Sequence, residues 1–101
     1  MKTTRIDYYE IIEATGAYGL GYTYKSVAEA LNEVNKTFKQ ALERGYDNSN
    51  KTYVIIKCEV SRIKSDADVF LSEKTSRTAV SFVRFEESLN CFIAVNENLE
   101  Y

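Results

Sequence analysis

SVAEALNEVNKTFKQALERG, residues 26–45, decides the layout of this chain, because it predicts one long amphipathic helix. Ser26 and Glu29 form the S-x-x-E pattern, in which the serine hydroxyl and the glutamate carboxylate satisfy free backbone N–H groups at a helix start. Gly45 favours the left-handed conformation that ends a helix. The expected helix runs from Val27 to Arg44. Its apolar residues share one stripe, made up of Val27, Ala30, Leu31, Val34, Phe38, Ala41 and Leu42.

The segment before the helix predicts a strand followed by a hairpin. Residues 5–14, RIDYYEIIEA, are rich in β-branched and aromatic side chains that alternate between two faces. Residues 19–24, GLGYTY, are short enough to form a second strand after a turn at Gly16–Gly19. On the first strand one face carries Ile6, Tyr8 and Ile12, and the other carries Tyr9 and Ile11.

The chain after the helix predicts further strands. Residues 51–64, KTYVIIKCEVSRIK, alternate as a strand with one buried face, formed by Val54, Ile56, Cys58 and Val60. Residues 65–77, SDADVFLSEKTSR, have turn formers at both ends of a short apolar core, and residues 78–85, TAVSFVRF, predict another strand that could pair with them. Residues 91–95, CFIAV, fit an edge strand or one turn of helix, and their periodicity does not decide between the two.

The predicted order of elements is β-β-α-β-β-β, which indicates an α+β fold. One helix would cover one face of a largely antiparallel sheet of four to five strands, as a two-layer sandwich. With 101 residues, the chain fits a single domain over residues 1–101. No apolar run approaches the roughly 20 residues of a membrane span, and the N-terminus lacks the apolar stretch of a signal peptide. We therefore expect a cytoplasmic protein without a membrane partner.

The residue types argue against an enzyme, a cofactor or a metal site. The chain has no histidine, so Ser-His and Cys-His pairs and the commonest general base are absent. Cys58 and Cys91 lie in apolar surroundings and form no Cys-x-x-Cys pair, so they are expected to remain thiols rather than to bind zinc. Asp66 and Asp68 lack the further ligands of a calcium loop and are expected to cap a turn.

The charges are unevenly distributed, although the net charge is only −2. Residues 1–84 hold all 13 basic side chains and 11 acidic ones, whereas residues 85–101 hold four acidic side chains and no basic one. These four acids form a candidate partner-binding patch, consisting of Glu86, Glu87, Glu97 and Glu100. The basic residues between Lys57 and Arg84 support an alternative function, a small nucleic-acid-binding accessory protein, but acidic residues are interleaved with them.

One stretch of the sequence resembles a chemical motif, the loop GAYGLGYTYKS at residues 16–26. A phosphate-binding P-loop needs lysine directly after its last glycine, and here Lys25 comes three residues later than that position. Two interpretations remain open. The glycines and tyrosines could form a structural hairpin, or Tyr18, Tyr22 and Tyr24 could present their rings to a partner protein.

The chain resembles, in overall type, the small orphan proteins of phages and mobile elements, among which anti-CRISPR proteins are the best-known class. The shared features are small size, acidic balance, a capped helix on a small sheet, no catalytic constellation and an AT-rich coding bias. Asn, Ile, Lys, Tyr and Phe supply 35 of the 101 residues. The resemblance implies a stoichiometric inhibitor that binds a host CRISPR effector nuclease and blocks its access to DNA. The class has no common sequence signature, so it assigns no residue.

Overall fold

The helix begins at the capping residue that the sequence predicts. The structure is a computed structural model, and it describes residues 1–14 and 22–95. Helix α1 spans Val27–Glu43, and the Ser26 hydroxyl accepts a hydrogen bond from the Glu29 N–H at 3.1 Å. The Glu29 carboxylate accepts the Lys25 N–H at 3.2 Å. Gly45 follows the helix with a φ of 88°, as expected for a left-handed helix stop.

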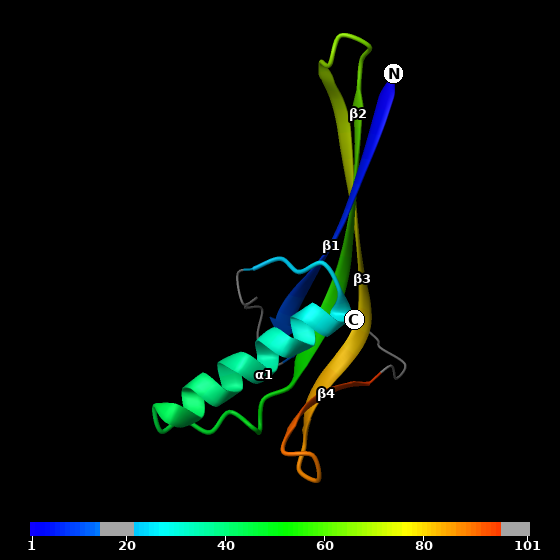
Figure 1. Cartoon of the computed structure of the whole chain (residues 1–101). Coiled ribbons are helices and arrows are strands. Elements are labelled where there is room, and N and C mark those ends of the chain that lie inside the picture. The colour runs from blue at the N-terminus through cyan, green and yellow to red at the C-terminus, as the bar shows by residue number, and fades with distance from the viewer. Residues whose placement is uncertain (15–21, 96–101) are drawn as a thin grey trace.

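Within the described residues, four antiparallel strands form a single sheet in the order β1-β2-β3-β4 (Figure 1). The strands are β1 at Lys2–Glu13, β2 at Tyr53–Lys64, β3 at Phe70–Glu86 and β4 at Cys91–Val95. Helix α1 crosses one face of this sheet, close to β4 and to the end of β1 (Figure 1). The predicted α+β class, with one helix on an antiparallel sheet, is therefore confirmed.

The order of elements differs from the prediction near the helix start. The predicted hairpin strand at residues 19–24 lies partly outside the described residues. Its described end contributes an isolated bridge, in which Tyr24 and Tyr9 exchange backbone hydrogen bonds of 2.8 and 2.9 Å. Over the described residues the order is therefore β-α-β-β-β.

The predicted pairing of residues 65–77 with residues 78–85 is wrong, because β3 runs through both segments as one strand from Phe70. The turn lies earlier, where the N–H of Ser65 donates to the Val69 carbonyl at 2.8 Å. Asp68 takes a positive φ of 60° within this turn. Residues 91–95 form the edge strand β4, which settles the choice that periodicity left open.

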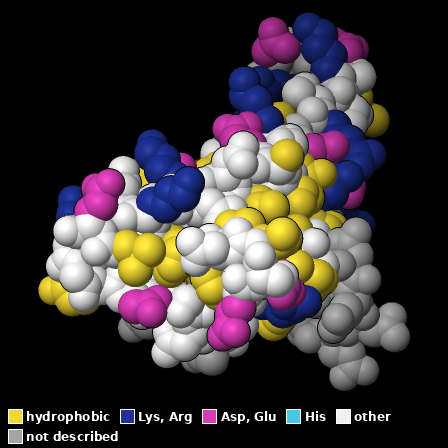
Figure 2. Space-filling view, turned by 60° about the horizontal axis from the view of Figure 1, so that its bottom comes forward, with side chains coloured by type: hydrophobic (Ala, Val, Ile, Leu, Met, Phe, Trp, Pro, Cys, Tyr) yellow, Lys and Arg dark blue, Asp and Glu magenta, His cyan; other side chains and the backbone are white. Residues whose placement is uncertain are grey.

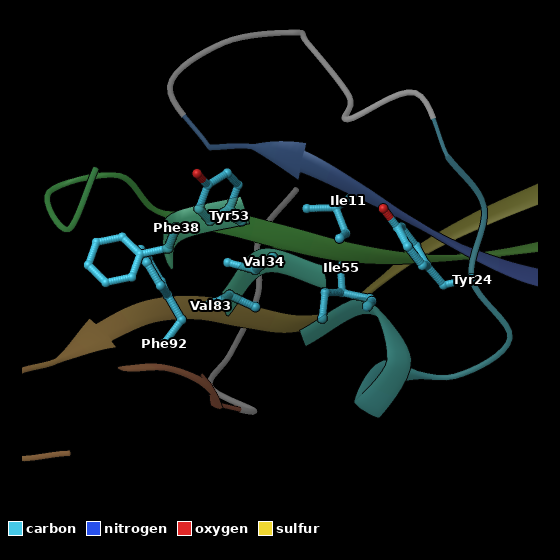
Figure 3. Packing of buried hydrophobic residues seen from close by; sticks show 9 residues of the cluster. Ile11, Tyr24, Val34, Phe38, Tyr53, Ile55, Val83 and Phe92 are labelled. Atoms are coloured by element: carbon cyan, nitrogen blue, oxygen red, sulfur yellow. The ribbon is translucent and has the colours of Figure 1, made fainter. Parts of the chain in front are cut away.

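Apolar side chains are buried on both faces of the sheet. On the helix face, Val34 and Phe38 of α1 pack against Ile11, Ile55 and Val83 (Figure 3). The opposite face, called the open face below, buries Val54, Ile56 and Cys58 under partly buried side chains of neighbouring strands, namely Tyr8, Ile12, Ala79 and Phe82. Residues 53–56 are thus buried on both faces, whereas the sequence predicts one buried face for this strand.

The side chain of Asn35 on α1 forms hydrogen bonds with the outer edge of β4. The Asn35 side-chain amide donates to the Phe92 carbonyl at 3.1 Å, and its Oδ1 accepts the Phe92 N–H at 2.8 Å. This pair of bonds replaces the neighbouring strand that an edge strand lacks. Nothing in the helical periodicity of the sequence marks Asn35 for this role.

Replacing Asn35 with alanine is expected to lower the free energy of unfolding by about 1–3 kcal/mol, because two backbone groups of Phe92 lose their partner. Asn32→Ala is the matched control, since Asn32 is exposed on the same helix and the gain in helix propensity is the same. Urea denaturation of both variants measures the difference. Equal midpoints for the two variants would contradict the assigned role of Asn35.

Candidate functional site

The sheet extends beyond the helix as a three-stranded arm (Figure 1). The arm consists of residues 2–7 of β1, 59–64 of β2 and 70–76 of β3, closed by the turn at residues 65–69. It gives the molecule an elongated form with extents of 54 × 30 × 22 Å. Residues 1–7 and 70–78, in the two outer strands, are all exposed, whereas the central strand is mostly half-buried between them and Val60 is 7% exposed.

Apolar side chains are exposed along this arm. At its tip three consecutive residues, Val69, Phe70 and Leu71, are 57%, 58% and 51% exposed. Ile6 is 44% exposed and lies opposite Val60 on the open face. Single exposed apolar residues are common, but three in succession at the end of a protruding arm form a contact surface that a partner protein can bury.

Ion pairs connect neighbouring strands of the arm and its turn. Charged side chains of both signs alternate along its visible surface (Figure 2). The paired groups are between 34% and 91% exposed, so each pair adds at most about 1 kcal/mol to stability. Their main effect is to keep the arm close to neutral. The pairs are the Met1 amino group with Asp66 at 2.7 Å, Lys2 with Asp68 at 3.3 Å, Arg62 with Glu73 at 2.7 Å, and Arg5 with Glu59.

The predicted basic surface between Lys57 and Arg84 is largely neutralised. A nucleic acid would have to compete with the acidic partners for these side chains, which weakens the phosphate contacts that drive such binding. Lys64 and Lys74 form no ion pair within the described residues. Four basic residues have carboxylate partners: Lys57 with Glu59 at 3.7 Å, Arg62 with Glu73 at 2.7 Å, Arg77 with Glu10 at 2.6 Å and Arg84 with Glu86 at 2.8 Å.

The three candidate tyrosines have different positions. Tyr24 is only 6% exposed and belongs to the core between sheet and helix (Figure 3). Burial, with a smaller effect of Glu33, raises the pKa of its phenol. Tyr22 is 68% exposed, and Tyr18 lies outside the described residues. The placement corrects the expectation for Tyr24, whose ring is not available to a partner, and leaves Tyr22 as an accessible contact residue.

The acidic patch is only partly described. Glu86 ends β3 and accepts hydrogen bonds from Arg84 at 2.8 Å and Ser88 at 3.0 Å. These bonds lower the pKa of Glu86, with Arg84 making the largest contribution. Glu87 is exposed in the turn before β4, at the opposite end of the sheet from the arm tip (Figure 1). The predicted contacts Glu97 and Glu100 lie outside the described residues.

The thiols and carboxylates of the described residues do not gather into a metal-binding cluster. Within residues 1–14 and 22–95, no group of three or more His, Cys, Asp or Glu side chains is arranged to hold a metal ion. Cys58 and Cys91 are free thiols, and burial raises the pKa of Cys58, which keeps that thiol protonated near pH 7. No helix in the described part of the chain is long and apolar enough to cross a membrane.

A comparison of the chain with protein-family models, with curated proteins and with solved structures found no match in any of the three. The candidate surface therefore rests on the geometry of the molecule itself. Its most prominent part, the arm tip, was not among the residues singled out from the sequence. The sequence pattern that could have indicated the arm tip is the short apolar run VFL at residues 69–71, but the same run also fits the core of a hairpin strand.

Proposed function

We propose that this protein acts by stoichiometric binding to a partner protein, with the arm as its main contact. The exposed arm is the observation that supports this proposal. The two outer strands of the arm are exposed and bury little apolar area, so they stabilise the fold less than the same residues would beneath the helix. It offers instead a projecting surface with an apolar tip and hydrogen-bonding strand edges.

The partner that we propose is a CRISPR effector nuclease of a bacterial host, as in the anti-CRISPR proteins that the chain resembles. The near-neutral, mixed charge of the arm supports a protein partner over a nucleic acid. An elongated domain of 101 residues is large enough to obstruct a DNA-binding channel without doing chemistry of its own. Exposed Tyr22 and Glu87 are further candidate contacts outside the arm.

Titration of the protein against purified RNA-guided nucleases tests this function. Cleavage of a DNA target is expected to fall linearly and to stop near one equivalent of the protein. Phe70→Ala is expected to weaken binding about 30-fold, which corresponds to about 2 kcal/mol for a buried interface anchor. Leu42→Ala is the control, because Leu42 is 46% exposed on α1, outside the arm and the other candidate contacts.

Two outcomes would count against the proposal. Full cleavage at a tenfold excess of protein, across the nucleases tested, would remove the inhibitor function. Direct, steeply salt-dependent binding of the protein to DNA or RNA would favour the nucleic-acid alternative instead.

A further inference from the structure

The outer edge of β1 is open along the arm. β1 is the first strand in the sheet order and forms one border of the arm, with the N-terminus near the tip (Figure 1). Tyr24 bonds to both backbone groups of Tyr9 and so occupies the edge where the arm meets the helix-covered part of the sheet. From Lys2 to Tyr8, β2 is the only strand beside β1 within the described residues. Such an edge is a template on which another chain can add a strand.

The hydrogen-bond pattern identifies the backbone groups that point outward from this edge. Tyr9 bonds to Tyr24 on the side away from β2, at 2.8 and 2.9 Å. The Ala14 N–H instead bonds toward the β2 side, to the Thr52 carbonyl at 2.9 Å. Sides alternate along an antiparallel strand, and β1 pairs with β2 without a register shift, so odd-numbered residues bond outward. On the arm, the outward N–H and C=O groups therefore belong to Thr3, Arg5 and Asp7.

This stretch of β1 lacks the features by which edge strands usually resist pairing. It contains no proline and no bulge, since it pairs with β2 residue for residue. Arg5 and Asp7 have opposite charges and lie 3.2 Å apart, so they do not repel every incoming strand as a run of lysines would. The outer edge of β4, in contrast, is covered by the side chain of Asn35.

We propose that an extended segment of the partner protein adds a strand to the sheet, antiparallel to β1 along residues 3–7. This inference rests on the proposed function, because it names the part of the arm that the partner binds and the chemistry of the bound segment. Thr3, Arg5 and Asp7 each exchange both of their free backbone hydrogen bonds with the residue directly opposite. β1 then lies between β2 and the strand of the partner.

The side chains of β1 specify the chemistry of this segment. Arg5 and Asp7 are exposed on the helix face, and the Arg5 guanidinium has more donors than its bonds to Asp7 and Glu59 use. An acidic residue opposite Arg5 and a basic residue opposite Asp7 place opposite charges directly across from each other. Between them, an apolar residue meets the exposed Ile6 on the open face. The partner segment therefore reads basic, apolar, acidic, followed by two strand-forming residues.

A second copy of this chain fits the edge less well. Two β1 strands could pair antiparallel with Arg5 of each copy opposite Asp7 of the other. The third residue of each copy would then lie opposite Tyr9, where Tyr24 is already bound. Tyr24 is 6% exposed within the core, so it cannot give way. Other registers place Arg5 opposite a second Arg5 or opposite Thr3, without a counter-charge. A short segment of a different protein avoids both problems.

Peptide binding tests the edge without a nuclease. The matched peptide contains Lys-Val-Glu-Val-Thr, acetylated and amidated at its ends, and the exchanged peptide has its Lys and Glu interchanged. In titrations to about 1 mM followed by NMR, the matched peptide is expected to bind at least about fivefold more tightly. At saturation, slower amide exchange is expected at Thr3, Arg5 and Asp7. Thr4 and Ile6 already bond to β2, so their exchange changes less. A contact through side chains alone does not produce this alternation.

Two variants separate the charges from the backbone. Asp7→Lys is expected to remove the preference between the peptides, because each then makes one opposite-charge pair and one like-charge pair. Thr3→Pro removes one outward N–H and leaves the bonds to β2 intact. It is expected to weaken the matched peptide, and inhibition of a nuclease, about fivefold. Thr3→Val is the matched control, because it keeps the N–H and the shape of the side chain.

The outcomes that would overturn this inference are distinct from a failure of inhibition, because the peptide measurement uses no nuclease. No binding of the matched peptide, equal affinities for the two peptides, or exchange protection without the alternation would each do so. Protected outward amides in the protein alone, with a mass that rises above 11.6 kDa with concentration, would assign the edge to a second copy instead. Equal inhibition by Thr3→Pro and Thr3→Val would show that a nuclease binds elsewhere on the arm.

Discussion

Phe92→Ala is expected to lower the free energy of unfolding by about 3–5 kcal/mol, the usual cost of deleting a fully buried aromatic ring. Phe92 is 1% exposed and has three aromatic neighbours. The ring centroids of Phe38, Phe85 and Tyr53 lie 5.4, 5.5 and 5.7 Å from it, in edge-on arrangements. Each such pair adds about 0.5–1.5 kcal/mol beyond the burial of its area.

The loss is expected to be large because the cavity cannot collapse. The backbone of Phe92 is tied to α1 through Asn35 and to β3 through its pairing with Phe85, so neither layer is free to move into the space. Ile93→Ala is the control, since Ile93 is half-buried on the opposite face of the same strand. Chemical denaturation compares the two. A loss for Phe92→Ala no greater than that for Ile93→Ala would show that the aromatic cluster does not anchor the helix.

Helix α1 and the part of the sheet that it covers were predictable, because the sequence patterns that indicate them are local. The Ser26 cap and the 3.6-residue spacing predict α1 to within one residue of its observed end at Glu43. The alternation in β1 also predicts the correct faces: Tyr9 and Ile11 pack on the helix face, and Tyr8 and Ile12 on the open face. A buried stripe leaves its period in the sequence because burial selects apolar residues.

The arm was not predictable by the same means. Residues 72–78 of β3 are exposed on both faces, so no burial selects an alternating pattern there, and the segment SEKTSRT has the composition of a loop. The first residues of β1 were missed for the same reason. Their strand structure depends on pairing with β2, a contact about 60 positions away in the sequence, such as Thr3 with Ile63.

The candidate site was likewise only partly predictable from the sequence. Sequence reasoning identified tyrosine as the residue type to examine, but the ring of Tyr24 faces the core while that of Tyr22 is exposed. The two positions differ by the bridge to Tyr9, which fixes the orientation of Tyr24 and forms only in the folded chain. Local sequence cannot show which tyrosine of such a loop is buried.

Tyr24 leads to the second large prediction, in which two substitutions at one position have opposite effects. Tyr24→Ala is expected to lower the free energy of unfolding by about 3–5 kcal/mol, because it empties a core position. Tyr24→Phe is expected to raise it by about 1 kcal/mol. The hydroxyl is buried and has no hydrogen-bond partner within the described residues, so its removal relieves a desolvation cost. Tyr22→Ala, at an exposed ring, is expected to change stability little.

The pH dependence gives this prediction a second readout. Burial raises the pKa of Tyr24 in the folded state, so folding disfavours the phenolate form. The stability linked to this group is present below its unfolded pKa of about 10 and is lost as the pH rises through the folded pKa. Tyr24→Phe has no phenol to ionise at this position and is expected to lose less stability above about pH 10 than the unchanged protein. Destabilisation by Tyr24→Phe would mean that the Tyr24 hydroxyl is hydrogen-bonded in solution. Equal alkaline loss in both proteins would mean that the pKa of this phenol is the same in the folded and unfolded states, which contradicts its burial.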